Sequence, residues 1–358
     1  MSRATEPAPM PAPINSQTST QADVKTIDIQ PDWKTEFSRC INSTDELLNY
    51  LQLDPQQLSV SQQAALSFPM QVPWPFVRRM EVGNPDDPLL SQVLPIDAEM
   101  QTMPGFSPDP LKEADHNPVP GIVHKYRNRL LLIVSPHCAI NCRYCFRRHF
   151  PYEENRQSKE QWQQALAYIS SMPEINEVIF SGGDPLAAND KFLGWLTEQI
   201  ANIPHIKRLR IHSRLPVVIP SRINQQFFGW ATTTRLKPVM VLHINHGNEI
   251  NDELAASIAQ CSANGILMLN QTVLLKGIND DAEILSALSE KLFDCGVTPY
   301  YLHLLDQVQG ASHFDVGRDK AKQIYAQLQA RLPGFLVPKL VTEIAGKRSK
   351  TQIISVGE

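Results

Sequence analysis

Short apolar runs alternate with amphipathic helical patterns from residue 129 onward, and this alternation limits the fold more than any other feature. Strand-like runs cover residues 129–135, 177–182, 208–213, 238–244, 267–275 and 298–305, and helical patterns lie near 159–172, 190–203, 221–234, 251–264, 281–295 and 317–332. Strands that alternate with helices form parallel sheets through right-handed crossovers. The pattern therefore predicts an α/β protein whose six strand–helix units curl into a partial (β/α)6 barrel of the TIM type.

Three cysteines, Cys138, Cys142 and Cys145, lie within eight residues shortly after the first strand-like run. Thiolates are soft ligands that select zinc or iron–sulfur clusters. A structural zinc site usually takes four ligands with its cysteines in two separate pairs, whereas this stretch is a single trio. Three thiolates fit a cubane cluster that keeps one iron open for a small molecule. The alternatives are a zinc knuckle completed by His137 or His149, or three unrelated thiols.

Polar residues follow the other predicted strands, where barrel enzymes carry their active sites. The second strand ends in Ser181-Gly182-Gly183-Asp184, whose glycines allow close approach of a ligand and whose carboxylate can take an ammonium group. Taken alone, this stretch is typical of a tight turn. The later strand ends carry Arg214, His243, Asn270-Gln271 and Asp306. Polar groups repeated after successive strands predict an active site at the mouth of the barrel, where the C-terminal ends of the strands meet.

The 358 residues carry a net charge of −4, so no basic field indicates nucleic-acid binding. No stretch resembles a signal peptide or a membrane span, which predicts a cytoplasmic protein with no membrane partner. Six cysteines, three of them bunched, indicate reduced thiols and a cluster instead of a disulfide framework. Cys40, Cys261 and Cys295 lie in helical patterns and are expected to be small buried hydrophobes.

The chain divides into four predicted regions. Residues 1–30 are rich in Pro, Ser, Thr and Gln and predict a disordered tail. Residues 31–120 predict a helical segment, broken at Pro69, Pro73 and Pro75, that continues as an irregular wrap around the main domain. Residues 121–334 form the barrel, and residues 335–358 form a C-terminal segment whose basic composition is typical of a solvated tail.

The Cys-x3-Cys-x2-Cys spacing resembles the radical S-adenosylmethionine (SAM) superfamily. From about residue 100 to the end, the chain resembles the lysine 2,3-aminomutase family, because Ser-Gly-Gly-Asp, Arg214, His-x-Asn-His-x-Asn-Glu, Asn-Gln-x-Val-Leu-Leu and Tyr-Leu-x-x-x-Asp occur in that family's order. The resemblance implies a radical SAM barrel with an N-terminal extension. It also implies a 4Fe-4S cluster on Cys138, Cys142 and Cys145, SAM on the open iron, and pyridoxal 5'-phosphate (PLP).

Residue roles carry over from the resemblance by position. Lys350 matches the lysine that carries PLP, and Lys347 competes with it because the family's glycine run is only partly kept here. Lys125 and Arg129 match the cations on the PLP phosphate, and Arg147 matches the arginine that holds the substrate carboxylate. The matches for SAM binding are Ser181, Gly182, Gly183, Asp184, Arg214, His243 and Gln271.

Two acidic positions indicate the substrate. Asp306 and Glu343 match the pair that binds the ε-ammonium of L-lysine, although free-lysine enzymes carry Asp at the second position. Glu343 and the eight residues after Lys350 resemble the short branch that makes β-lysine for modification of elongation factor P. The expected partners are L-lysine, a flavodoxin- or ferredoxin-type reductant, elongation factor P with its lysyl ligase, and a second copy of the chain.

Three alternatives to this function are open. The first is a catabolic 2,3-aminomutase that acts on free lysine only. The second is a radical SAM enzyme without PLP. The third is a non-catalytic zinc-binding or scaffold protein for translation factors, which leaves the polar strand ends without an explanation.

Overall fold

The computed structural model describes residues 32–152 and 157–353, and the predicted disordered tail 1–30 lies outside them. The described residues form one compact unit. Within the described residues, no helix is both long and apolar enough to span a membrane.

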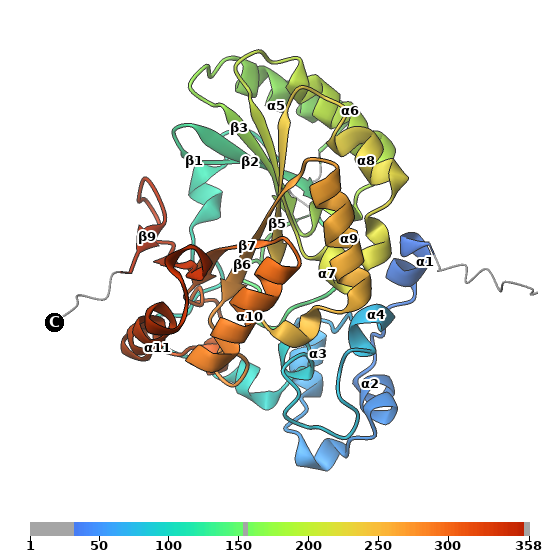
Figure 1. Cartoon of the computed structure of the whole chain (residues 1–358), viewed down its shortest axis with the longest axis vertical. Coiled ribbons are helices and arrows are strands. Elements are labelled where there is room, and N and C mark those ends of the chain that lie inside the picture. Colours follow the sequence, from blue (N-terminus) through green and yellow to red (C-terminus); the bar gives the residue numbers. More distant parts are fainter. Residues whose placement is uncertain (1–31, 153–156, 354–358) are drawn as a thin grey trace, which may run out of the picture. The chain divides into compact units, whose positions relative to one another are not determined.

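One sheet of nine strands organises this unit (Figure 1). All neighbours from β2 to β8 pair in parallel, and the antiparallel strands β1 and β9 lie at the two edges. Because the described strands follow a linear order, β1 and β9 do not pair with each other and the barrel stays partial. The bounds are β1 Ile122–Tyr126, β2 Arg129–Ser135, β3 Glu177–Gly182, β4 Arg208–Ser213, β5 Lys237–His243, β6 Leu267–Val273, β7 Thr298–His303, β8 Lys339–Thr342 and β9 Thr351–Gln352.

The six predicted strands are confirmed as β2 to β7, but three strands were missed. Strand β8 pairs in parallel with β7, so the sheet continues into the C-terminal segment that composition alone describes as a solvated tail. The strands β1, β8 and β9 are five residues or shorter, and they carry several polar side chains. Short mixed runs give only a weak periodic signal, because pairing with a distant strand decides whether they become extended.

The helices after the strands are α5 Lys159–Ser170, α6 Asp190–Ala201, α7 Leu215–Val218, α8 Gln225–Ala231, α9 Asp252–Ala263, α10 Ala282–Asp294 and α11 Arg318–Arg331. Five predicted helices are confirmed within two residues, and the predicted helix 221–234 is wrong in extent. A 3₁₀ turn over Pro220–Arg222 precedes α8. The Asn224 side chain then accepts a hydrogen bond from the Phe227 N–H, which makes Asn224 the cap where α8 begins.

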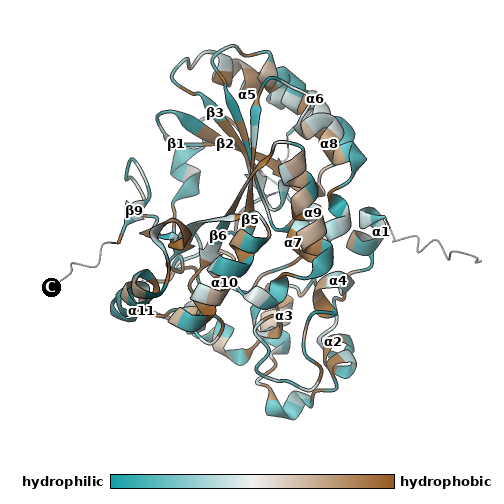
Figure 2. Cartoon of the chain, in the orientation of Figure 1, coloured by the Kyte–Doolittle hydropathy of each residue, from teal (hydrophilic) through white to brown (hydrophobic). Residues whose placement is uncertain are grey.

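The two faces of the sheet have different surroundings. One face carries side chains such as Leu132, Phe180, Ile211 and Leu242, which belong to the main hydrophobic core together with residues of α5, α6, α8 and α9. Figure 2 shows hydrophobic colour on the strands and on the helix sides turned toward them. The opposite face is the inside of the partial barrel, and it carries the polar residues considered below.

The N-terminal extension contains the short helices α1 Trp33–Ser38, α2 Thr44–Leu51, α3 Gln62–Ser67 and α4 Trp74–Val77, followed by irregular chain with 3₁₀ helices. Pro73 and Pro75 do not only break a helix: they flank the first residue of α4, where a proline is tolerated. Arg143 of the cysteine loop ties the extension to the barrel. Its buried guanidinium pairs with Glu99 at 2.6 Å and donates to the carbonyl of Phe68 at 2.5 Å.

Candidate active site

The cysteine loop follows β2 at the C-terminal edge of the parallel strands. Cys138, Cys142 and Cys145 are partly exposed and free of disulfides. Burial and the neighbouring thiols of Cys145 and Cys142 all raise the pKa of Cys138, so the three sulfurs lie near one another. No three described His, Cys, Asp or Glu side chains are arranged to hold a single metal ion. A 4Fe-4S cluster does not need such convergence, because each thiolate binds a different iron.

Two glycines bring the end of β3 against this loop. Gly182 has φ +126°, and a Cβ there would lie 2.4 Å from the Ser135 carbonyl oxygen. A Cβ on Gly183 would lie 2.7 Å from the His137 carbonyl oxygen. Real side chains do not tolerate such distances, so only glycine lets the two loops approach. The neighbouring Ser181 points its hydroxyl into the site and accepts a hydrogen bond from the guanidinium of Arg147 at 3.0 Å.

The carboxylate of Asp184 is held by four hydrogen bonds from the chain itself. One carboxylate oxygen accepts from the Ser213 hydroxyl at 2.7 Å and the Leu186 N–H at 3.0 Å. The other accepts from the N–H groups of Arg214 and Leu215, both at 2.8 Å. A carboxylate has about four acceptor positions, and the chain fills all of them. Asp184 therefore joins the ends of β3 and β4, and its predicted contact with SAM stays a prediction.

Arg214 lies at the centre of a buried polar network beside the cysteine loop. One guanidinium nitrogen donates to the Cys142 sulfur at 2.8 Å and also contacts the Tyr144 hydroxyl. The other donates to Gln92 at 2.7 Å and to Glu249 at 3.1 Å. Sequence reasoning did not single out Gln92, which comes from the N-terminal extension. No local signal marks it, because its role depends on contact with residues more than a hundred positions away.

Strand register places His212, His243, Gln271 and His303 on the inner face of the sheet. His243 and Gln271 are direct partners across β5 and β6, and their side-chain nitrogens lie 2.7 Å apart. Burial lowers the pKa of His243 to about 3, and it lowers the pKa of His212 and His303 well below the usual range. The Nε2 atoms of His212 and His303 have no hydrogen-bond partner among the described residues. Neutral, unpartnered imidazoles on this face fit a site that receives a ligand.

A continuous chain of five charges crosses the inner face. Arg147 pairs with Glu113 at 2.7 Å, Glu113 with Lys125 at 3.3 Å, Lys125 with Glu343 at 3.0 Å, and Glu343 with Lys350 at 2.7 Å. Burial alone would raise the pKa of Glu343, but Lys350 and Lys125 lower it to about 2. Glu113 was not predicted, because its stretch of the irregular wrap has no periodicity.

Asp306 is an acid of the site that takes no part in this chain of ion pairs. Its carboxyl group makes no hydrogen bond or ion pair with a described residue. Burial raises the pKa of Asp306 to about 7, Glu343 raises it as well, and Lys350 acts in the opposite direction. A cation that binds beside such an acid strongly stabilises its ionised form. The ring of Tyr301 lies on the same side, 5.8 Å from the Lys350 ammonium.

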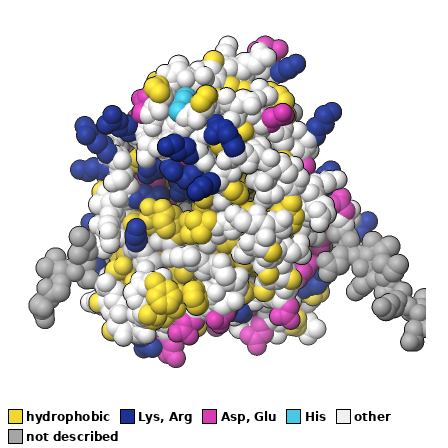
Figure 3. Space-filling view, turned by 45° about the horizontal axis from the view of Figure 1, so that its top comes forward, with side chains coloured by type: hydrophobic (Ala, Val, Ile, Leu, Met, Phe, Trp, Pro, Cys, Tyr) yellow, Lys and Arg dark blue, Asp and Glu magenta, His cyan; other side chains and the backbone are white. Residues whose placement is uncertain are grey.

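Two other predicted cations lie apart from these contacts. Arg129 begins β2, at the end remote from the cysteines, where it stacks on the Tyr126 ring at 4.2 Å and donates to Asn128 at 3.0 Å. Lys347 is exposed, whereas Lys350 is partly buried and paired, so the geometry favours Lys350 as the functional lysine. Figure 3 shows Lys and Arg side chains gathered near the centre of one face, next to hydrophobic surface.

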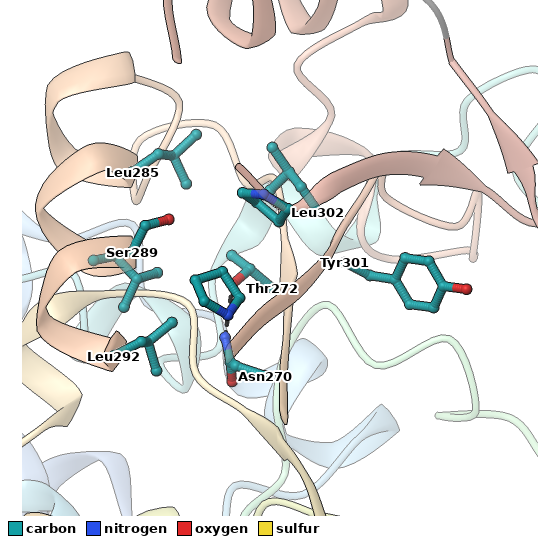
Figure 4. Close-up of a pocket in the computed structure, with 10 residues that line it drawn as sticks. Asn270, Thr272, Leu285, Ser289, Leu292, Tyr301 and Leu302 are labelled. Carbon is teal, nitrogen blue, oxygen red and sulfur yellow. Dashed lines mark hydrogen bonds between the residues drawn. The ribbon is translucent and has the colours of Figure 1, made fainter. Parts of the chain in front are cut away.

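Asn270 does not face the barrel mouth, contrary to the sequence analysis. Its side chain donates to the Ile244 carbonyl at 3.0 Å and to the Thr272 hydroxyl at 2.9 Å, so its role is to stabilise the sheet. Figure 4 shows Asn270 and Thr272 turned toward Leu285, Ser289 and Leu292 of α10, around a small pocket outside the barrel. The ring of Tyr301 points away from this pocket. Only Gln271 of the predicted pair faces inward.

Comparison with known proteins gives a consistent result. A family model described as the Radical SAM superfamily matches residues 132–288. An L-lysine 2,3-aminomutase of Haemophilus influenzae is 53% identical over 322 residues, which cover 90% of this chain and 95% of the relative. A protein of the same name from Escherichia coli K12 is 51% identical over 323 residues, covering 90% and 94%. The L-lysine 2,3-aminomutase of Clostridium subterminale is 31% identical over 325 residues, covering 90% and 78%.

The matched region contains the cysteine loop, the paired glycines and the inner-face histidines of β4 and β5. A radical SAM family implies a 4Fe-4S cluster with SAM, and the free thiols beside a glycine-lined approach suit that pair of groups. The chain therefore belongs to the L-lysine 2,3-aminomutases, isomerases of the radical SAM superfamily.

Proposed function

We propose that this chain is a PLP-dependent L-lysine 2,3-aminomutase that makes β-lysine for the modification of elongation factor P. The array from Arg147 through Glu113, Lys125 and Glu343 to Lys350 carries this proposal. It joins a carboxylate-binding cation, a phosphate-binding cation and a lysine nucleophile on the inner face that the cysteine loop adjoins.

The residues divide between the cofactors. Cys138, Cys142 and Cys145 would hold the cluster, while SAM would contact Ser181, Gly182, Gly183, Arg214, His243 and Gln271. Lys350 would carry PLP, with Lys125 and Arg129 on its phosphate. When bound, the cluster and SAM supply hydrogen abstraction, and PLP supplies electron delocalisation while the amino group migrates from Cα to Cβ.

The protein's own groups would orient lysine from both ends. Arg147, which is 7% exposed, would attract the substrate carboxylate in a site that excludes most water. At the other end, the unpaired Asp306 carboxyl would take the ε-ammonium group. Glu343, which pairs with Lys350 at 2.7 Å, would be the second acid beside Asp306. A glutamate substrate would leave Asp306 facing a second acid, which is unfavourable in a buried site.

The role in elongation factor P modification rests on a smaller set of observations. The resemblance implies that Glu343 stands where free-lysine enzymes carry Asp. Relatives of 53% and 51% identity match this chain over 95% and 94% of their length. The Clostridium subterminale relative matches over 78% of its length. A catabolic enzyme acting on free lysine is the competing function. The reductant of flavodoxin or ferredoxin type, the cytoplasmic location and self-association are parts of the same proposal.

The test is anaerobic incubation of the reconstituted protein with reductant, SAM, PLP and L-lysine, followed by chromatography for β-lysine. Product that depends on both SAM and PLP supports the aminomutase, and transfer of that product to elongation factor P by its ligase supports the pathway. The absence of product from protein that holds cluster and PLP would refute lysine as the substrate.

The variants Lys350→Ala and Lys347→Ala form a matched pair for the PLP assignment. We expect Lys350→Ala to lose the absorbance of covalently bound PLP and nearly all turnover, because Lys125, the other partly buried amine beside Glu343 in the described chain, is assigned to the PLP phosphate. Lys347→Ala removes an exposed lysine three residues away and should keep both. Covalently bound PLP in Lys350→Ala, or its loss in Lys347→Ala, would overturn the assignment.

A further inference from the structure

One buried carboxylate lies between two cations that the proposed function gives to different ligands. Glu113 Oε2 accepts from Arg147 Nε at 2.7 Å, and Glu113 Oε1 accepts from Arg147 Nη2 at 2.9 Å. The same Oε1 accepts from the Lys125 ammonium at 3.3 Å. Glu113 is 5% exposed, so water does not compete for these contacts.

The donor inventory of the two cations shows what remains for ligands. A guanidinium has five N–H donors. Arg147 spends two on Glu113 and two on Ser181 and the Gly182 carbonyl, which leaves one on Nη2. The Lys125 ammonium spends two of its three donors on Glu113 and Glu343, which also leaves one. Glu113 thus occupies the Nε–Nη2 edge of Arg147, the residue that the resemblance assigns to the substrate carboxylate.

Glu113 is itself held in place by the chain. It opens the 3₁₀ helix η4 (Glu113–His116), and its N–H donates to the Asp109 carboxylate at 3.2 Å. Lys112 before it adopts the left-handed conformation with φ 49°. This conformation is uncommon for residues other than glycine and persists where surrounding contacts enforce it. Glu113 is therefore presented to the two cations from a defined turn.

We propose that Glu113 is a positioning residue that sets the separation of Arg147 and Lys125, and with it the distance between the substrate carboxylate and the cofactor phosphate. Two cations that share one anion stay together, whereas without the anion they repel each other across a site that water enters poorly. The inference rests on the proposed function, because that function assigns a ligand to each cation. It adds a residue that touches neither ligand.

The experiment measures two affinity ratios on full-length protein that carries its cluster, without turnover. The first ratio compares PLP with pyridoxal, which lacks the phosphate, by absorbance titration. The second compares L-lysine with 1,5-diaminopentane, which lacks the carboxylate, in displacing Lys350 from bound PLP. Glu113→Gln keeps the side chain's shape but loses its charge and one acceptor. We expect both ratios to fall about tenfold together, because without the shared anion the two cations repel each other and leave the positions from which each would meet its ligand.

Matched variants separate the possible results. Asp115→Asn, an exposed acid on the same 3₁₀ helix, should leave both ratios unchanged. Glu113→Asp keeps the charge and should restore part of each ratio, including in the case that Glu113→Gln folds poorly. Unchanged ratios in Glu113→Gln, or a fall in only one of them, overturn the proposal. Arg147→Gln tests the proposed function separately: if it leaves the lysine ratio unchanged, Arg147 does not bind the substrate carboxylate, whatever Glu113 does.

Discussion

Replacing Asp306 with asparagine tests whether this acid lowers the free energy of unfolding of the protein as long as no substrate is bound. Burial raises the pKa of Asp306 to about 7 in the folded protein, with Glu343 adding to the rise and Lys350 opposing it. An aspartate in an unfolded chain titrates near about 3.9. Between these two values the folded state binds more protons than the unfolded state.

The sign follows from this difference in proton binding. Stability falls as pH rises wherever the folded state holds the extra proton. The cost of Asp306 is therefore absent below about pH 4, grows as pH rises, and is complete above about pH 7. Three pKa units correspond to about 4 kcal/mol. The amide of asparagine is itself polar and would be partly buried without a partner, so we expect a net gain of about 2 kcal/mol at pH 8.

The assay is urea unfolding of the cluster-containing, ligand-free protein at pH 5, 6.5 and 8 under anaerobic conditions. The stability difference between Asp306→Asn and the wild type should increase steadily with pH. Lysine affinity should fall in the same variant, because its ammonium loses a charged partner. Asp294→Asn, an exposed acid at the end of α10, controls for the loss of any carboxylate. A difference that does not change with pH, or a variant less stable than the wild type at pH 8, would refute the reasoning.

Two further predictions concern the neighbouring groups. Gly183→Ala should lower the iron content of reconstituted protein several-fold, because its Cβ would lie 2.7 Å from the His137 carbonyl oxygen; Gly229→Ala, with nothing within 4 Å, should not. Equal iron contents would show that the glycine approach is unnecessary. Burial acts to raise the pKa of Glu343, but Lys350 and Lys125 lower it to about 2, so its contribution to stability is present above about pH 4.5 and lost as pH falls through 2. Glu343→Gln should therefore destabilise the protein by about 2 kcal/mol at pH 7, and an effect that persists at pH 2 in denaturant titrations would contradict this.

The alternating pattern predicted six strands and most of the helices correctly because the forces involved act locally. A strand covered by helices on one face needs a run of β-branched and aliphatic residues such as those from Leu130 to Val134. Helix starts are marked by capping residues such as Ser158 and Asn251, which bond to N–H groups three residues away. The spacing of Cys138, Cys142 and Cys145 is local in the same sense, and it identified the resemblance to the radical SAM superfamily.

Motifs were less informative where the partner of a side chain lies elsewhere in the chain. Ser-Gly-Gly-Asp shows an acid near a ligand-binding turn, but not that Asp184 spends both oxygens on Ser213, Leu186, Arg214 and Leu215. Asn270 and Gln271 are adjacent in sequence, yet strand alternation turns one to the helices and the other to the barrel. The direction of a side chain on a strand depends on register, which motif matching does not supply.

The sequence by itself determined the class of fold, the cysteine loop and the polar ends of the strands, because hydrophobic period and ligand spacing are properties of contiguous residues. Only the tertiary structure decided that β8 extends the sheet, that Gln92 reaches Arg214, and that Glu113 holds Arg147 and Lys125 together. Those contacts join residues far apart in the chain. Their energy exists only after the backbone has brought the charges into one buried space, so no local pattern records them.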